Sequence, residues 1–186
     1  MSQSNILFEC QYQLGLGVHY HMRRQSYFDT WHRITSALSL IFSTSAVAVF
    51  TDKTSLGAML IAVVAIVQCI DLIVDTRGKA TLHNDLRSKY LMLEHELLGY
   101  GIQLTDDQFQ TIMMKIKTIE IHEPPVRKLL LEVCSNDVAR RLGCKLSDLI
   151  SIGWFKRNTA NMFNWPSAKE AEEAKEAKKL KGNSIV

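Results

Sequence analysis

The side chains able to perform chemistry are scattered along this sequence and form no recognisable catalytic set. His19 and His21 are two positions apart, which on a helix points them to different sides. His95 and Glu96 begin the HExxH zinc motif, but no second histidine follows at the required spacing. The sequence also contains no P-loop and no GxSxG nucleophile motif. It therefore predicts no catalytic residues, no cofactor and no enzyme activity.

Two weaker patterns have structural interpretations. Glu120, His122 and Glu123 form a carboxylate–histidine cluster at the end of a predicted helix, with no other ligand obviously placed beside it. Gly15 and Gly17 begin a GxGxx pattern, but a tyrosine occupies the third glycine position and no strand precedes it. The sequence therefore predicts no metal site and no dinucleotide site.

Two long apolar runs dominate the first half of the chain. The first is uncharged from residue 34 to 50 and follows Trp31, a suitable interfacial anchor, while the second occupies residues 56–74. Each has about the 20 residues needed to cross a hydrocarbon core of ~30 Å. The polar residues 51–55 between them predict a helical hairpin with spans at about 31–50 and 56–74. The alternative is a buried soluble αα-hairpin, for which the chain has little other apolar mass to wrap both helices.

Basic residues gather at the outer ends of this hairpin: Arg23, Arg24, Arg33, Arg77, Lys79, Arg87 and Lys89. The connector holds only Lys53, which Asp52 offsets. Because cytoplasmic flanks carry the excess of Lys and Arg, both termini are expected in the cytoplasm.

The second run is expected to continue as a helix through residues 80–98, which contain no helix breaker and end at Gly99 and Gly101. Its apolar strip has a heptad-like spacing: Leu82, Leu86, Tyr90, Leu93 and Leu97. Such a strip predicts packing on a second copy and hence a homo-oligomer, for which a tetramer is one option. The alternative is that the strip packs against later helices of its own chain.

Two shorter helices complete the predicted fold. Thr105 and Gln108 form a capping box that starts the first, which ends before the Glu-Pro-Pro turn at 123–125. The second occupies 126–142 and stops at Gly143. The fold class is thus an all-α membrane protein, a two-helix transmembrane hairpin with long cytoplasmic helices in a symmetric homo-oligomer.

Three regions follow from this pattern: an N-terminal tail (1–11), a two-transmembrane domain (12–155) and a charged C-terminal tail (156–186). Polar residues within the hairpin are candidates to line a pore: Ser36, Ser39, Ser43, Gln68, Asp71 and Asp75. Small hydroxyl residues also serve helix packing, and an acidic residue near the end of a span can be solvated at the interface. Both interpretations stay open.

Taken in chain order, these features resemble the SLATT family, two-transmembrane effector domains associated in bacteria with SMODS nucleotidyltransferases and SLOG domains. The stretches that carry the resemblance are RRQSYFDTWHR at 23–33, LRSKY at 86–90 with LE at 93–94, and EPP at 123–125 followed by CSND at 134–137 and LG at 142–143. It covers about residues 12–155, with Asp137 where the family more often has Glu.

The resemblance implies an antiphage effector that forms a pore or otherwise disrupts the bacterial inner membrane, arresting or killing an infected cell. The expected partners are membrane lipid, further copies of the chain, and a nucleotidyltransferase or its nucleotide product as the gating signal. The competing class is a non-pore membrane anchor or scaffold that recruits a cytoplasmic partner. A net charge of +3 over 186 residues gives no reason to expect direct DNA binding.

Overall fold

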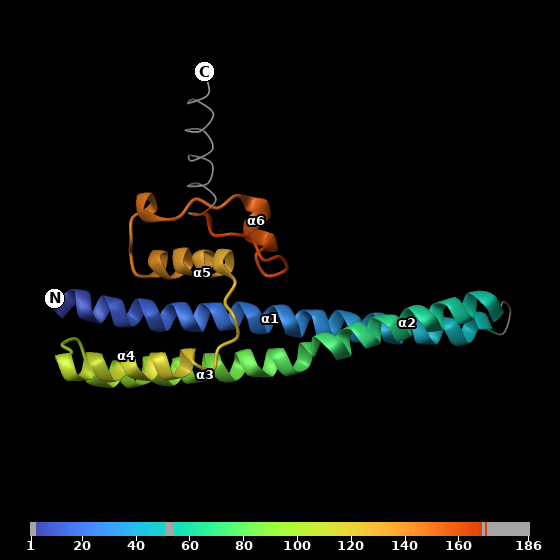
Figure 1. Cartoon of the computed structure of the whole chain (residues 1–186), viewed down its shortest axis with the longest axis horizontal. Coiled ribbons are helices and arrows are strands. Elements are labelled where there is room, and N and C mark those ends of the chain that lie inside the picture. The colour runs from blue at the N-terminus through green and yellow to red at the C-terminus, as the bar shows by residue number, and fades with distance from the viewer. Residues whose placement is uncertain (1–2, 51–53, 169, 171–186) are drawn as a thin grey trace, which may run out of the picture. The chain divides into compact units, whose positions relative to one another are not determined.

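The computed structural model describes residues 3–50, 54–168 and 170, without the side chains at 3–4, 45–50, 54 and 56. Within this part every regular element is a helix (Figure 1), which confirms the all-α prediction. The elements are α1 (Gln3–Phe50), α2 (Thr54–Val74), α3 (Thr76–Tyr100), α4 (Asp106–Glu120), α5 (Lys128–Arg141), the 3-10 turn η1 (Leu146–Asp148) and α6 (Trp154–Thr159).

Local chemistry sets several of these helix ends as predicted. Gly101 follows α3 with a φ of 80°, and Gly143 follows α5 with a φ of 82°, a backbone region that glycine enters without steric cost. Thr105 caps α4 by accepting a hydrogen bond from the Gln108 backbone, while the Gln108 side chain accepts one from the Thr105 backbone. The predicted capping box is confirmed.

The chain divides into two compact units. We call Arg24–Asn84 the hairpin unit, and Met1–Arg23 together with Asp85–Val186 the core unit. This division differs from the predicted one at 11/12 and 155/156. Residues 3–11 already belong to α1, where Ile6 and Cys10 are buried, and Ala160 is buried beyond the predicted boundary. The predicted boundaries at 11/12 and 155/156 remain predictions.

The core unit is built around the first part of α1, which lies between α3 and α4 on one side and α5 on the other (Figure 1). One buried cluster joins α1 to α3 and α4: Ile6, Cys10, Leu14, Val18, Tyr90, Leu93, Leu97, Leu104, Ile112 and Ile116. The other joins α1 to α5 and α6: Tyr20, Leu129, Leu130, Val133, Cys134 and Ala160.

The hairpin unit pairs the second part of α1 with α2 in antiparallel orientation. The Gln68 amide donates to the Ser39 hydroxyl, and His32 Nδ1 lies 3.1 Å from Asp71 Oδ2. Large apolar side chains on both helices are exposed: Ile34, Leu38, Leu40, Ile41, Met59, Ile61, Val63, Ile66, Ile70, Leu72 and Ile73. The unit therefore has an apolar exterior and a few polar pairs between its helices.

Among the described residues, one helical path is long and apolar enough to cross a membrane, Gly57–Tyr100. Only 6% of its most apolar 18-residue window is buried, unlike a helix inside a soluble core. This path contains the second predicted span. The sequence predicts two spans, and the described residues supply one candidate, because the last six side chains of the first predicted span (45–50) lie outside the description. Of the predicted connector at 51–55, residues 51–53 also lie outside it, while Thr54 and Ser55 begin α2.

The path from α2 to α3 is interrupted at Asp75, where the sequence predicts a continuous helix. Asp75 has a φ of 50°, a conformation that Asp tolerates better than most residues. Its carboxylate accepts a hydrogen bond from the Gly78 backbone at 3.1 Å, so it caps the start of α3. A Cβ at Gly78 would lie 2.1 Å from Asp75 Oδ2, which explains the glycine. Asp75 thus ends one helix and starts the next.

Candidate functional site

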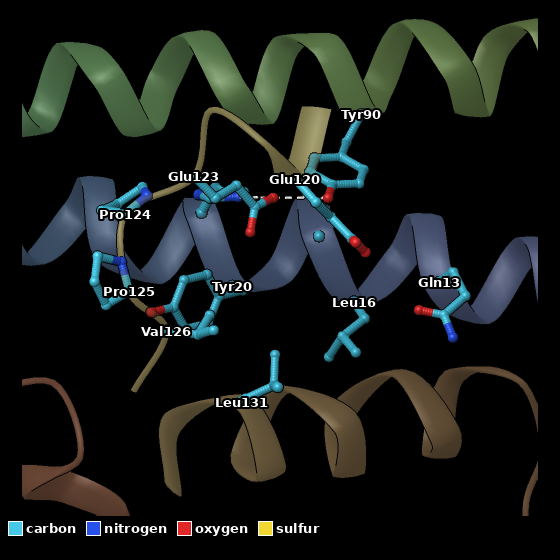
Figure 2. Close-up of a pocket in the computed structure, with 12 residues that line it drawn as sticks. Gln13, Leu16, Tyr20, Tyr90, Glu120, Glu123, Pro124, Pro125, Val126 and Leu131 are labelled. Carbon is cyan, nitrogen blue, oxygen red and sulfur yellow. Dashed lines mark hydrogen bonds and ion pairs between the residues drawn. The ribbon is translucent and has the colours of Figure 1, made fainter. Parts of the chain in front are cut away.

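A cavity of about 420 Å³ opens in the core unit where α1 faces α3, α5 and the connection between α4 and α5 (Figure 2). The connection is the Glu-Pro-Pro turn, whose two prolines lie at the cavity wall. Proline has no backbone N–H to donate, so α4 cannot continue through the turn. The cavity has the size of a small-molecule site and combines apolar walls with a few polar groups.

The polar centre of the cavity is the carboxylate of Glu123, which Figure 2 shows pointing toward Tyr90. The Tyr90 hydroxyl donates to Glu123 Oε1 at 2.7 Å, and His21 Nε2 lies 3.0 Å from the same oxygen. His21 is fully buried and Tyr90 is 3% exposed. One carboxylate oxygen therefore joins α1, α3 and the α4–α5 connection, which are separated by 102 and 33 positions in the sequence.

Aromatic packing fixes the positions of these groups. The His21 and Tyr90 rings are stacked with centroids 5.7 Å apart, and the Tyr20 ring meets His21 edge-on at 5.3 Å. The Tyr20 hydroxyl accepts a hydrogen bond from the Arg127 backbone at 3.0 Å. A Cβ at Gly17 would lie 2.5 Å from the Tyr90 ring, so glycine is needed for α1 and α3 to approach. The cavity is thus rigidly framed.

The two glycines of the GxGxx pattern have packing roles. Gly17 accommodates Tyr90, and a Cβ at Gly15 would lie 3.2 Å from Val138 of α5. Together they let α1 pack closely against helices on both sides. The structural interpretation of this pattern fits these contacts.

A second polar site lies on α5, in the Cys134–Asp137 stretch that carried part of the family resemblance. The Ser135 hydroxyl is 2.6 Å from the Tyr12 hydroxyl of α1. The Asn136 side chain donates to the Ile150 carbonyl at 2.7 Å and accepts from the Ile150 backbone N–H at 2.9 Å. Burial raises the pKa of the Cys134 thiol to about 12. Ser135 and Asn136 therefore connect α5 to two other parts of the core unit, while Cys134 is buried in its core.

Asp137 is surrounded by arginine. Its carboxylate lies 2.6 Å from the Arg23 guanidinium, 3.6 Å from Arg140 and 3.7 Å from Arg157. We call these four residues the arginine cluster. It borders a second cavity of about 290 Å³, lined by Asn136, Asp137, Arg140 and Arg157 among others. No spacing in the sequence indicates this cluster, because Arg23 is 114 positions from Asp137.

The predicted pore residues fall into two groups. Ser36, Ser43 and Gln68 are exposed and Ser39 is partly buried against Gln68. Asp71 also accepts a hydrogen bond from Thr76 at 2.6 Å, in addition to its contact with His32. Asp75 is exposed at the helix break described above. The structure thus pairs Ser39 with Gln68, and it gives both carboxylates structural partners within the hairpin unit.

The predicted self-association strip is mostly inside the chain. Leu86 is fully buried, and Tyr90, Leu93 and Leu97 belong to the buried cluster with α1 and α4. Of the five residues, Leu82 alone remains exposed, at 39%. The burial corresponds to the alternative reading, in which the strip packs on later helices of the same chain, and also on α1. Self-association through this strip remains a prediction.

Within the described residues, no group of three or more His, Cys, Asp or Glu side chains is placed to hold a metal ion. Glu120 and Glu123 both line the first cavity, whereas His122 contacts the Thr118 carbonyl on its own helix. The carboxylate–histidine cluster of the sequence is therefore not assembled as one site.

The comparisons with known proteins add no relative. No family model matches the chain, and no curated protein or solved structure matches it significantly. The likeness to SLATT domains accordingly stands on the residues quoted for it and enters only as a proposal below.

Proposed function

We propose that this chain is a membrane effector of a bacterial antiphage system. In this proposal its hairpin unit crosses the inner membrane twice, and several copies form a pore or otherwise disrupt the bilayer. A nucleotide or a partner protein acts on the cytoplasmic core unit and gates the assembly. The observation that carries the proposal is the apolar exterior of the hairpin unit.

The exposure of this exterior is unfavourable in water. Leu40 is 68% exposed, Leu72 81% and Ile73 82%. Each buried large aliphatic side chain contributes roughly 1.5–3 kcal/mol relative to an exposed one. A helical hairpin that leaves most of its apolar side chains exposed therefore favours a lipid environment or a large protein contact.

The polar groups of the hairpin unit also suit a bilayer. Backbone groups in the described parts of α1 and α2 are satisfied within the helices, as lipid requires. Gln68 bonds to Ser39 across the two helices, and Asp71 bonds to His32 and Thr76. Polar side chains that pair between helices are a common means of holding transmembrane helices together.

A basic–aromatic cluster supports the proposed orientation. The Arg24 guanidinium lies 4.5 Å from the centroid of the Phe28 ring, Lys79 Nζ lies 5.7 Å from it, and the His83 ring stacks on it at 5.8 Å. Cations and aromatic rings gather at membrane–water interfaces, and basic residues prefer the cytoplasmic one. The residues belong to the ends of the hairpin unit, which favours cytoplasmic termini.

A pore requires several copies, because two helices cannot enclose water. Ser36 and Ser43 are exposed on α1 and would face the common axis, with Asp75 at the cytoplasmic mouth. Carboxylates from every copy would add there and attract cations. We propose cation flux, with membrane depolarisation and growth arrest as its consequence.

Ion flux from liposomes containing the purified chain tests this function. Ser43→Leu should abolish the flux of the parent protein, because it narrows and dries the path. Thr44→Leu is the matched control, since the Thr44 hydroxyl bonds to the Leu40 and Ile41 carbonyls of its own helix. The flux is measured without and with added nucleotide, and insertion of the parent without flux in either condition would reject a nucleotide-gated pore.

That result would favour the alternative, a membrane anchor that recruits a partner. One observation supports it: the core unit exposes large apolar side chains around α6, with Trp154 at 78%, Phe155 at 59% and Phe163 at 53%. Exposed aromatic side chains are typical of protein contact surfaces.

A further inference from the structure

The arginine cluster has a surplus of positive charge. Three guanidinium groups lie within 4 Å of the Asp137 carboxylate, which formally neutralises one of them. The Arg140 and Arg157 side chains are 46% and 45% exposed, whereas Asp137 is only 19% exposed. The carboxylate thus occupies the centre of a cationic site that has capacity for a further anion.

A cavity is built beside this cluster. Asn136 fixes its wall by the two hydrogen bonds to the Ile150 backbone, and Ser151 supplies a hydroxyl to the lining. Its volume of about 290 Å³ is close to the lower limit for small-molecule sites, roughly 300 Å³. Guanidinium groups bind phosphate oxygens through pairs of parallel hydrogen bonds. The cavity therefore combines room for a small ligand with the cations that recognise phosphate.

His19 lies near the cluster and feels charges of both signs. The pKa of His19 is lowered, first by partial burial and then by the charge of Arg141, with Arg23 adding to the effect. The charges of Asp137 and Glu94 oppose this shift without reversing it.

We propose that this cavity binds a phosphate group of a small ligand, with Arg140 and Arg157 as the main contacts and Asp137 as the carboxylate that the phosphate displaces. Under the proposed function, on which this identification rests, the ligand is the nucleotide that gates the effector. Phosphate carries more negative charge than the carboxylate that it replaces. It therefore neutralises more of the positive charge of the three arginines.

Displacement of Asp137 would reach α1 directly. Arg23 bonds to Asp137 at 2.6 Å and is the last residue of the core unit on α1, which continues without interruption into the hairpin unit. A phosphate that takes the place of the Asp137 carboxylate between Arg140 and Arg157 moves a side chain that also contacts α1 through Arg23. A ligand shifts an equilibrium only by its differential affinity for two states, so a change in this contact is the route by which the site would act on α1.

Calorimetric titration of the detergent-solubilised full chain with inorganic pyrophosphate and with ATP tests the site. We expect binding by the parent and a loss of roughly tenfold in affinity for Arg140→Gln and for Arg157→Gln, since each removes a charged hydrogen-bond donor. Asp137→Asn should have the opposite effect and tighten binding by roughly tenfold, because it removes the competing charge. Circular dichroism checks that each variant is folded.

Glu94→Gln is the matched control, because it removes the same charge from another arginine pair of the core unit, Arg141–Glu94 at 2.9 Å. It should leave pyrophosphate affinity unchanged. Equal effects of Glu94→Gln and Asp137→Asn would reduce the site to general surface charge and overturn it. Absence of binding by the parent to either probe would overturn it too.

Anionic lipid is the other source of phosphate. Flotation with phosphatidylglycerol vesicles, compared with phosphatidylcholine vesicles, should not depend on Arg140 or Arg157. If flotation depends on Arg140 or Arg157 while pyrophosphate and ATP fail to bind, the lipid headgroup is the ligand and the nucleotide assignment is wrong. Binding is measured by calorimetry in detergent and flux is measured in liposomes, so a failure of the pore and a failure of this site are separate results.

Discussion

Glu123 contacts side chains from two helices of the core unit. Its Oε1 atom receives Tyr90 of α3 and contacts His21 of α1, and the residue itself begins the Pro-Pro turn that leads to α5. A buried carboxylate is unfavourable unless its oxygens are hydrogen-bonded. The contacts with Tyr90 and His21 therefore stabilise the Glu123 carboxylate and connect α1, α3 and the α4–α5 turn.

Tyr90→Phe tests this connection. It removes one hydrogen bond to an ionised acceptor while keeping the ring, so we expect the free energy of unfolding to fall by about 1.5–3 kcal/mol. Tyr100→Phe makes the same change at a more exposed donor, which bonds to Glu96 at 2.7 Å, and should cost much less. Thermal unfolding in detergent, followed by circular dichroism, measures both variants. An equal loss of stability in the two would mean that the Tyr90–Glu123 hydrogen bond contributes no more than the exposed Tyr100–Glu96 bond.

Cys134 gives a prediction about pH. Because its pKa is about 12, the thiol should stay protonated at pH values where an ordinary thiol is already largely ionised. The thiolate is the reactive form, so iodoacetamide should label the partly exposed Cys144 at pH ~9 and spare Cys134 in the folded chain. Labelling of Cys134 should begin only as the pH rises toward 12, and denaturant should abolish the difference. Early labelling of Cys134 in the native chain would contradict its burial.

At the scale of elements, the sequence predicted what neighbouring residues determine. The capping box of Thr105 and Gln108 and the glycine stops at Gly101 and Gly143 involve groups within a few positions of each other. The contacts of Glu123 with His21 and of Asp137 with Arg23 join positions over 100 apart, and no spacing rule could find them. These two sets of contacts could therefore be found only in the tertiary structure.

The break at Asp75 shows a local feature that the sequence pattern concealed. The apolar periodicity continues on both sides of it, so the sequence predicts one helix. Two residues identify the break: Asp75, whose carboxylate can cap a helix, and Gly78 three positions later. Gly78 has no Cβ that would collide with the Asp75 carboxylate.

Gly78→Ala tests the break. Alanine favours a helix over glycine by about 1 kcal/mol, but here its Cβ would collide with the capping carboxylate, so no gain in stability is expected. Gly99→Ala lies near the other end of α3 with nothing within 4 Å of the added Cβ, and should stabilise by about 0.5–1 kcal/mol. Thermal unfolding compares the two; an equal gain in both would mean that the Asp75 cap is dispensable.

The strip on α3 gives a second test at this scale. Leu93 is 7% exposed in the core cluster, so Leu93→Lys should destroy cooperative unfolding. Leu98→Lys, at a position that is 72% exposed, should be tolerated. If Leu93→Lys remained folded by circular dichroism but eluted at a smaller size than the parent, the strip would be an interface between copies after all.

At the scale of the whole molecule, the two units pose different physical problems. The core unit buries two apolar clusters within itself, whereas the large apolar side chains of the hairpin unit are mostly exposed. The described residues contain one candidate span, and the proposed function requires two. The number of spans decides whether the two chain ends lie on the same side of the membrane, so topology is the property that separates these possibilities.

A reporter enzyme active only in the periplasm measures this topology. With two spans, a fusion after Val186 and one before Met1 should both be silent, while an insertion between Asp52 and Lys53 should be active. The reason is that Arg and Lys flank the outer ends of the hairpin and stay in the cytoplasm. With a single span, the two terminal fusions would differ from each other.

Replacing Arg23, Arg24 and Arg33 with Gln should weaken the orientation, because these residues flank the first span. The same change at Arg140 and Arg141, far from the hairpin in sequence, should leave the orientation unchanged. Two active terminal fusions would instead reverse the orientation and place the arginine cluster outside the reach of a cytoplasmic nucleotide.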